Sequence, residues 1–275
     1  MYLRPTTLRD ACAALAGRRL TLLAGGTDHY AGAPRPDGDI LDLTAVAALR
    51  GIRRERGSWR IGATTTWSEV LDARLPPAFD ALKQAAREVG GLQIQNAGTV
   101  AGNLCNASPA ADGVPPLLAL DASVELCSTR GERTMRLRDF LRGARRTALA
   151  PDEIVCAIRI PSPAPGTRGR FLKLGARRYL VISIAMVAVV LEVRGPRIAG
   201  ARIAVGACSA VAQRLEALED SLVGVAPDGT LGERARPEHL AALQPIDDVR
   251  ASAEYRREAA LALVRRALNE TGALK

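Results

Sequence analysis

Aromatic residues are scarce in this sequence of 275 residues, since Phe, Trp and Tyr together make up only 3% of the chain. Aliphatic side chains must therefore fill most of the core, and 48% of the residues are hydrophobic, as in an ordinary globular protein. The scarcity argues against a surface for single-stranded nucleic acid, because such surfaces stack bases on aromatic rings. A chain of this length is expected to form two or three subdomains rather than one compact unit.

Acidic residues are outnumbered: 38 Lys and Arg face 29 Asp and Glu, which gives a formal net charge of +9. The arginines are scattered, and the densest groups, at 53–56 and 142–146, contain no aromatic residue. Neither zinc-finger spacing nor an RNA-binding aromatic signature is present. We therefore expect no nucleic-acid partner and assign the charge to a bound anionic cofactor or an acidic protein partner.

Long apolar runs are missing as well. The most apolar stretch, 180–193, has about 14 residues and contains Ser183 and Glu192, whereas a membrane-spanning helix needs about 20 apolar residues. The first residues show no charged leader followed by an apolar stretch, so they do not resemble a secretory signal. The sequence predicts a cytoplasmic protein without a membrane span.

Paired cysteines are absent. The five cysteines, Cys12, Cys105, Cys127, Cys156 and Cys208, lie far apart, and no Cys-x-x-Cys pair occurs. This spacing predicts neither a zinc site nor an iron–sulfur cluster, so any redox metal is expected in another chain. The odd count favours reduced, mostly buried thiols.

The pattern of apolar residues and breakers predicts alternating helices and strands in three units. Three prolines within 161–166 exclude helix and interior strand and mark the strongest boundary. A small α/β unit and a mixed α+β unit precede this boundary. We expect strands at 20–23, 40–41, 51–54, 59–61, 123–127, 134–137, 154–160, 171–174 and 198–206, and helices at 7–16, around 79–89, and at 212–222, 237–243 and 251–269.

The first segment that suggests chemistry is Ala-Gly-Gly-Thr-Asp at 24–28, directly after an apolar strand. Glycines tolerate positive φ and let backbone N–H groups approach an anion, which is how a phosphate-binding nest forms. The segment lacks the third glycine of the dinucleotide fingerprint and the lysine of the P-loop. Taken alone, it is more often an ordinary turn.

The second segment, 96–109, consists almost entirely of small or hydrogen-bonding residues and includes Asn96, Asn103 and Asn106. A surface linker usually carries more charge or serine, so this composition favours packing beside a polar ligand, although a capped, tightly turned connection remains open. Two such loops about 75 residues apart, one from each unit, fit a cofactor in the cleft between the units, because ligands often bind at such interfaces.

Together these segments resemble the FAD-binding, or medium, subunit of the molybdenum hydroxylases, the family of the xanthine and carbon monoxide dehydrogenases. In that family an Ala-Gly-Gly loop holds the flavin pyrophosphate, and a Thr-Ile/Val-Gly-Gly-Asn segment followed by Ala-Ser/Asp-Pro and an Asp forms a second grip. This chain carries the matching residues at 24–28, 99–103, 107–109 and Asp112. The resemblance extends from about Pro5 to the C-terminus.

The resemblance implies an α+β fold: an FAD-binding domain of the PCMH or vanillyl-alcohol-oxidase type, followed by a C-terminal α+β domain of sheet plus helices. The FAD-binding domain would consist of two α/β subdomains, at 1–56 and 57–165, and the C-terminal domain would span 166–275. The chain departs from the family at Ala101, which replaces the first glycine of the second segment. A requirement for positive φ there would cost about 1 kcal/mol and weaken cofactor binding.

The resemblance also implies which residues bind FAD, with no catalytic side chain and no metal ligand among them. The implied set is Leu22, Leu23, Ala24, Gly25, Gly26, Thr27, Asp28, His29, Thr99, Val100, Ala101, Gly102, Asn103, Ser108, Asp112, Val155 and Lys173. Asp112 would orient the loop nearest the flavin, while Val155 and Lys173 would flank the adenine side.

Structural roles remain open for several of these residues. Val155 lies in an apolar strand and fits a core position, and Lys173 fits the solvated end of a strand. His29 is either a flavin neighbour or a partly exposed structural residue. Tyr179, outside the implied set, either packs on the isoalloxazine or caps a strand.

The function implied by the resemblance is electron transfer. A molybdopterin-binding large subunit would oxidise the substrate, a ferredoxin-like small subunit would relay electrons through [2Fe-2S] clusters, and this chain's FAD would pass them to NAD, a quinone or oxygen. One alternative is a stand-alone FAD-dependent oxidoreductase that acts on its own small substrate. Another is a scaffold that has lost its flavin, which Ala101 would permit.

Overall fold

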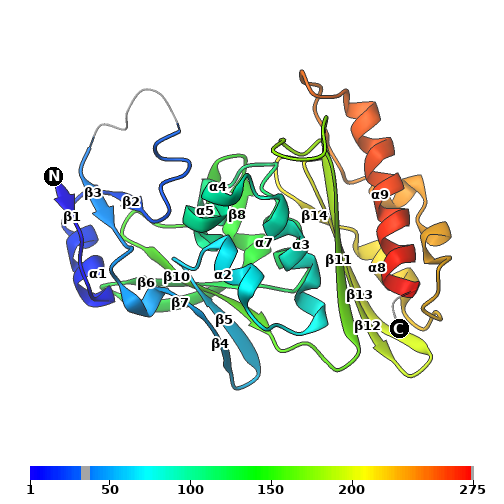
Figure 1. Cartoon of the computed structure of the whole chain (residues 1–275), viewed down its shortest axis with the longest axis horizontal. Coiled ribbons are helices and arrows are strands. Elements are labelled where there is room, and N and C mark those ends of the chain that lie inside the picture. Colours follow the sequence, from blue (N-terminus) through cyan, green and yellow to red (C-terminus); the bar gives the residue numbers. More distant parts are fainter. Residues whose placement is uncertain (32–37, 274–275) are drawn as a thin grey trace.

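A computed structural model describes residues 1–31 and 38–273. Three sheets of three or more strands follow one another along the long axis of the molecule, in the order of the sequence, and helices pack on each of them (Figure 1). None of the helices in this described part of the chain combines the length and hydropathy that crossing a bilayer requires.

The N-terminal sheet is small and parallel. It contains β1 (Tyr2–Leu3), β2 (Thr21–Leu23) and β3 (Ile40–Asp42) in the order β1-β3-β2. Helix α1 (Leu8–Ala16) begins where the Thr7 side chain accepts a hydrogen bond from the Asp10 N–H, which satisfies one of the free amides of its first turn. Strand β2 ends at Leu23, and the first glycine-rich segment starts directly after it.

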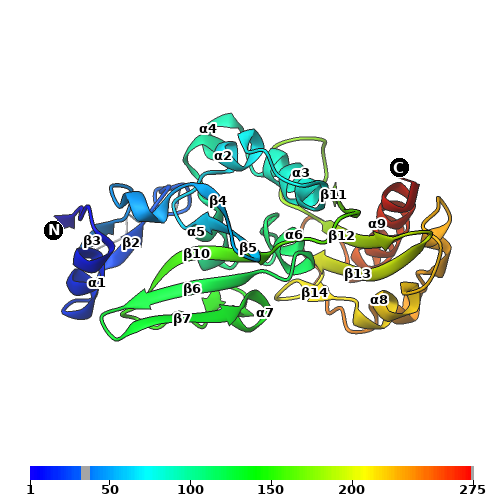
Figure 2. The same ribbon diagram turned by 90° about the horizontal axis from the view of Figure 1, so that it is seen from below.

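The central sheet has five antiparallel strands in the order β4-β5-β10-β6-β7. Figure 2 shows helices α2, α3 and α4 together on one side of it. The strands are β4 (Ile52–Glu55), β5 (Ser58–Gly62), β6 (Ser123–Ser128), β7 (Gly131–Arg136) and β10 (Ile154–Pro161). The helices are α2 (Trp67–Asp72), α3 (Asp80–Glu88), α4 (Leu92–Ala97), α5 (Val100–Asn106), α6 (Val114–Ala119) and α7 (Leu137–Phe140), and β8 (Leu141–Gly143) pairs with β9 (Arg146–Thr147).

The C-terminal sheet is antiparallel, in the order β11-β12-β13-β14. Its strands are β11 (Thr167–Leu174), β12 (Ala185–Arg194), β13 (Arg197–Gly206) and β14 (Gln213–Arg214), and it packs against α8 (Glu216–Leu222) and α9 (Ala253–Ala273). Helices α3 and α6 of the preceding unit also contact this sheet. Short 3-10 turns span Ala47–Leu49, Pro77–Phe79, Leu231–Arg234 and Pro237–Leu240.

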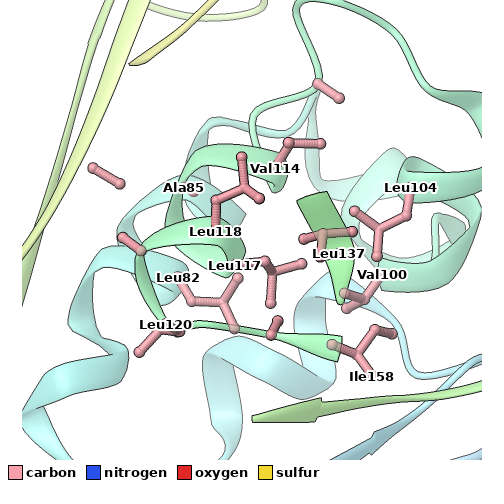
Figure 3. Packing of buried hydrophobic residues seen from close by; sticks show 14 of the residues in the cluster. Leu82, Ala85, Val100, Leu104, Val114, Leu117, Leu118, Leu120, Leu137 and Ile158 are labelled. Carbon is pink, nitrogen blue, oxygen red and sulfur yellow. The ribbon is translucent and has the colours of Figure 1, made fainter. Parts of the chain in front are cut away.

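Strand β12 explains the most apolar stretch of the sequence. Its residues alternate between two cores, because successive side chains of a strand point to opposite faces. Met186, Ala188 and Val190 join the core of the central unit, while Val187 and Val189 join the core under α8 and α9. Figure 3 shows the first of these cores, in which α3, α5 and α6 bring their leucines and valines together. Strand β12 thus contributes side chains to the cores of both the central and the C-terminal unit.

Most predicted elements are present, with differences near 96–109, 212–214 and 237–243. The second segment, 96–109, which was interpreted as a loop, contains the end of α4 and all of α5. Residues 213–214 form β14 rather than the start of a helix, and α8 begins at Glu216. The predicted helix at 237–243 is only the 3-10 turn Pro237–Leu240.

The expectation of five reduced thiols is wrong for one pair. Cys127 on β6 and Cys156 on β10 form a disulfide between neighbouring strands, with 6.3 Å between their Cα atoms. A register irregularity between Val155 and Ala157 accompanies this contact. Cys12 and Cys208 are buried thiols as expected, whereas Cys105 is exposed.

Candidate functional site

A cleft of about 1490 Å³ opens where the ends of the three sheets meet. Loops and helix ends from all three units line it, in segments at 22–29, 88–94, 98–112, 144–155, 180–183, 207–210 and 244–256. Of the residues that the resemblance implies as FAD ligands, all except Val100 and Lys173 lie on its surface. Val100 is fully buried in the core beneath α5.

The two glycine-containing segments touch each other at the bottom of this cleft. A Cβ atom on Gly25 would lie 1.9 Å from the Ala97 backbone oxygen and 2.9 Å from the Gly98 Cα atom, so only glycine fits there. The hydroxyl of Thr27 lies beside Gly98, 3.5 Å from where a Cβ on that glycine would be. Residues 22 through 28 and 97 through 103 therefore form one continuous surface.

The first segment presents a row of backbone N–H donors. Among the described residues, the backbone N–H groups from Gly25 to His29 donate no hydrogen bond. Gly26 has a φ of 69°, which turns the chain in the way that brings successive N–H groups toward one point. Such a nest binds the oxygen atoms of a phosphate or another anion.

The second segment starts a short helix rather than forming a loop. Thr99 is the residue before α5, and its side chain accepts a hydrogen bond from the Gly102 N–H at 3.0 Å. Backbone hydrogen bonds from Trp67 N to Gly98 O and from Val100 N to Thr65 O fix its start on the preceding unit. The Ala101 N–H has no acceptor among the described residues, and the Asn103 Oδ1 atom is buried without a partner.

Ala101 carries no backbone strain. It lies in the first turn of α5 with right-handed helical backbone, and it is not among the non-glycine residues with positive φ. Its side chain is 4% exposed and packs into the core of the central unit. The cost anticipated for replacing glycine at this position therefore does not arise.

Asp112 joins the C-terminal unit to the cleft. Its carboxylate accepts hydrogen bonds from Lys173 Nζ at 2.7 Å and from Ser183 Oγ at 2.6 Å. Lys173 is on β11 and also donates to the Glu88 backbone oxygen at 3.3 Å. Burial raises the pKa of the Asp112 carboxyl, while the ammonium of Lys173 acts in the opposite direction. The solvated strand end considered for Lys173 is wrong, because its side chain is only 6% exposed.

The remaining candidates take different positions. Val155 is buried in β10 and still contributes to the cleft wall. The rings of His29 and Tyr30 contact each other edge to face, with 4.8 Å between their centres. Tyr179 is 60% exposed, does not line the cleft, and lies under the guanidinium of Arg178.

Several cleft residues were not anticipated from the sequence. Arg145 contributes a cation beside the second segment, where its guanidinium contacts the Asn106 side chain. The C-terminal unit adds the apolar side chains of Leu180, Ile182 and Ile246. No local motif marks these residues, because only the packing of the C-terminal sheet against α3 and α6 brings them to the cleft.

The donors present fit FAD. A dianionic pyrophosphate needs converging N–H groups, which the first segment and Ala101 supply, and Arg145 supplies a nearby cation. The unpartnered Asn103 Oδ1 atom adds a buried acceptor in the second segment, where the ribityl hydroxyls would be recognised. The cleft is also large enough for a dinucleotide.

Comparisons with known proteins agree with this geometry. The family described as FAD binding domain in molybdopterin dehydrogenase matches residues 1–163, and the CO dehydrogenase flavoprotein C-terminal domain matches residues 170–271. The nicotine 6-hydroxylase medium subunit of Paenarthrobacter nicotinovorans is 32% identical over 278 residues, covering 99% of this chain and 97% of the relative. The carbon monoxide dehydrogenase medium chain of Hydrogenophaga pseudoflava is 30% identical, covering 98% and 95%.

The fold is shared with a solved relative. The reconstituted CO dehydrogenase from Oligotropha carboxidovorans contains a chain that superposes with a TM-score of 0.92 at 30% identity, covering 98% of this chain and 96% of that one. The predicted α+β fold, a PCMH-type FAD-binding domain followed by a C-terminal domain, is confirmed. The chain belongs to the molybdopterin dehydrogenase FAD-binding family and is the FAD-binding medium subunit of a multi-subunit dehydrogenase of the molybdenum hydroxylase type.

Proposed function

We propose that this subunit receives electrons from [2Fe-2S] clusters of a ferredoxin-like small subunit and passes them through FAD to NAD, a quinone or oxygen. A molybdopterin-binding large subunit would oxidise the substrate in the same complex. The observation that carries the proposal is the cleft in which the Gly25–His29 amides and the α5 start face one another. The relatives named as medium subunit and medium chain support a multi-chain assembly.

The cofactor supplies the redox chemistry, and the residues of this chain bind and orient it. We propose that the amides of 25–29 and of Ala101 hold the pyrophosphate, with Asn103 on the ribityl chain. The Asp112–Lys173 pair would fix the wall beside the ring system, because both side chains are buried and joined at 2.7 Å. Lys173 is therefore proposed beside Asp112 and not, as the resemblance implied, beside Val155 on the adenine side. Val155 would pack against the other end of the cofactor.

We propose three structural units for this function, 1–56, 57–165 and 166–275. The N-terminal sheet contains strands of the first range alone and the C-terminal sheet strands of the third range alone, which supports this division, whereas β4 (Ile52–Glu55) of the first range belongs to the central sheet. The first two units would hold FAD between them, and the third would close the cleft through Ser183 and Lys173. A cytoplasmic location stays a prediction.

Reconstitution tests the proposal. The purified chain is mixed with FAD, and bound flavin is measured by its visible absorbance and by the dissociation constant. The chain is then coexpressed with neighbouring genes that encode a cysteine-rich ferredoxin-like chain and a molybdopterin-binding chain, and flavin reduction by the complex is followed with substrate present. We expect tight FAD binding by the chain and flavin reduction only in the complex.

Two results would overturn the proposal. A chain that takes up no FAD would not be the flavin carrier. A chain that binds FAD and oxidises a small substrate without partners would instead be the stand-alone oxidoreductase.

A further inference from the structure

One carboxylate beside Asp112 has no cation partner in the part of the chain that the structure describes. Glu88 is the last residue of α3, lines the cleft and is half-buried. It forms no ion pair with the described residues, whereas Asp112 is paired with Lys173 at 2.7 Å. Because that pair is neutral, Glu88 leaves the wall formed by these three residues with one uncompensated negative charge.

The backbone around Glu88 is held by side chains from two other elements. From β11, Lys173 Nζ donates to the Glu88 backbone oxygen at 3.3 Å. From α4, Gln95 Nε2 donates to the backbone oxygens of Arg87 and Gly90 at 3.1 and 3.4 Å. The position of Glu88 on the cleft wall is therefore fixed from both sides.

The Glu88 carboxylate lies close to that of Asp112. Burial raises the pKa of Asp112, the ammonium of Lys173 lowers it, and the negative charge of Glu88 raises it again. Lys173 reaches both residues, since its Nζ atom also donates to the Asp112 carboxylate at 2.7 Å. Both acids line the cleft, as do Val89 and Leu180. The uncompensated charge is therefore located at the same end of the cleft as Asp112.

A carboxylate at this position opposes folding stability for two reasons. The C-terminal end of a helix carries a partial negative charge, so an acid in the last turn of α3 is unfavourable. The nearby Asp112 carboxylate adds repulsion between like charges. No described cation is paired with Glu88 to offset these effects. A residue that lowers stability in this way at a binding cleft is typical of one retained for function.

We propose that Glu88 lowers the reduction potential of the bound flavin. The inference rests on the proposed function, which places the Asp112–Lys173 pair beside the ring system. Uptake of two electrons and one proton converts the neutral oxidised ring into an anion. The Glu88 carboxylate repels this added charge, whereas it acts equally on the pyrophosphate in both redox states. The chain therefore binds reduced FAD less tightly than it would without Glu88, and the bound cofactor gives up its electrons more readily.

The test compares the full wild-type chain and Glu88→Gln, both loaded with FAD, in mildly alkaline buffer without oxygen. The reduction potential is measured from the equilibrium between the flavin and a reference dye during slow reduction by dithionite. We expect Glu88→Gln to shift this equilibrium about 10-fold toward reduced flavin, the effect of removing one nearby charge. Added salt should diminish the shift by screening. Asp248, Arg250 and Arg256 also line the cleft, but they bind one another and are the same in both proteins.

Two further variants separate the charge from the shape of the side chain. Glu88→Asp keeps the charge and should retain most of the wild-type potential. Asp80→Asn removes an acid from the other end of α3, away from the cleft, and should leave the equilibrium unchanged. Dissociation constants for both redox states complete the test, because Glu88→Gln should tighten binding of reduced FAD about 10-fold more than that of oxidised FAD. An equal change in both constants would indicate a merely structural role and refute the inference.

Thermal unfolding of the FAD-free chain examines the same carboxylate without the cofactor. Glu88→Gln should raise the Tm, because it removes a negative charge from the end of α3 and from the neighbourhood of Asp112. A lower Tm would make Glu88 a structural residue and overturn the inference. A chain that takes up no FAD would overturn the proposed function and this inference together. FAD uptake with equal potentials in wild type and Glu88→Gln would overturn this inference alone.

Discussion

Replacing Gly25 with alanine puts a methyl group into the contact between the two cofactor-binding segments. The new Cβ would lie 1.9 Å from the Ala97 oxygen, 2.7 Å from the Ala97 carbonyl carbon and 2.9 Å from the Gly98 Cα atom. All three atoms belong to the backbone, so no side-chain rotation relieves the overlap. The two segments must separate by at least about 1.5 Å to reach ordinary contact distance.

The size of the effect follows from that displacement. Overpacking of this kind costs about 1–3 kcal/mol of folding free energy, which corresponds to a fall in Tm of about 2–10 °C for a chain of this size. The separation also moves the Gly25–His29 amides away from Ala101. Loss of one charge-assisted hydrogen bond to the pyrophosphate, about 1.5–3 kcal/mol, weakens FAD binding about 10- to 100-fold.

The assay combines thermal unfolding of the FAD-free chain with fluorescence titration of FAD. Gly17→Ala is the control, because a Cβ on Gly17 would meet no atom within 4 Å and its φ of -97° suits alanine. The control should match the wild type in both measurements. A Gly25→Ala chain that binds FAD with wild-type affinity would refute the idea that contact between the segments shapes the cofactor site.

Three further substitutions test the parts around this contact. Lys173→Met should destabilise the chain by about 3–5 kcal/mol in urea unfolding, because it leaves the buried Asp112 carboxylate unpaired. Adding Asp112→Asn to this variant should restore much of the lost stability. A double variant as unstable as Lys173→Met would argue against the ion pair. Thr99→Ala should cost about 1 kcal/mol by removing the α5 cap, whereas Thr99→Ser should unfold like the wild type. The third substitution is Asp248→Asn. Desolvation raises the pKa of Asp248, but hydrogen bonds from the Arg250 N–H and the Arg256 guanidinium outweigh it and lower this pKa to about 2, below the unfolded value of 3.8. The stabilisation by the ionised Asp248 carboxylate is therefore complete above about pH 4 and is lost toward pH 2. The Tm difference between wild type and Asp248→Asn should narrow as the pH falls through that range. A constant difference would contradict the lowered pKa.

Short-range patterns made much of the fold predictable. In the hairpin β4–β5, strand β5 alternates apolar Trp59 and Ile61 with polar residues after a glycine turn, and α1 carries a Thr cap before an apolar face, so both could be predicted from the local sequence. Helix α5 could not, because Gly102, Asn103 and Asn106 have low helix propensity. It is helical because Thr99 caps it and because Val100 and Leu104 pack into the core, and such tertiary packing cannot be recognised in a short stretch of sequence.

The cofactor motifs were visible in the sequence for a different reason. Close backbone approach at Gly25 and positive φ at Gly26 leave few residue types that fit, so the segment keeps a recognisable composition. The cleft residues of the C-terminal unit do not restrict the residue type in this way. Leu180, Ile182 and Ile246 need only be apolar and exposed, and their position depends on how β11 and β12 pack against α3 and α6.

The C-terminal unit is therefore part of the site and not an appendage to it. Strand β12 is buried on both faces, and its inner face, with Met186 and Val190, completes the core on which α6 rests. Asp112 precedes that helix. Among residues 1–31 and 38–273, its carboxylate forms an ion pair only with Lys173 and accepts a hydrogen bond from Ser183, and both residues belong to the C-terminal unit. Without that unit, the buried carboxylate would be unpaired and the core beside α6 exposed. Both effects move the loop that carries Asp112, so formation of the cofactor cleft is coupled to docking of the C-terminal sheet.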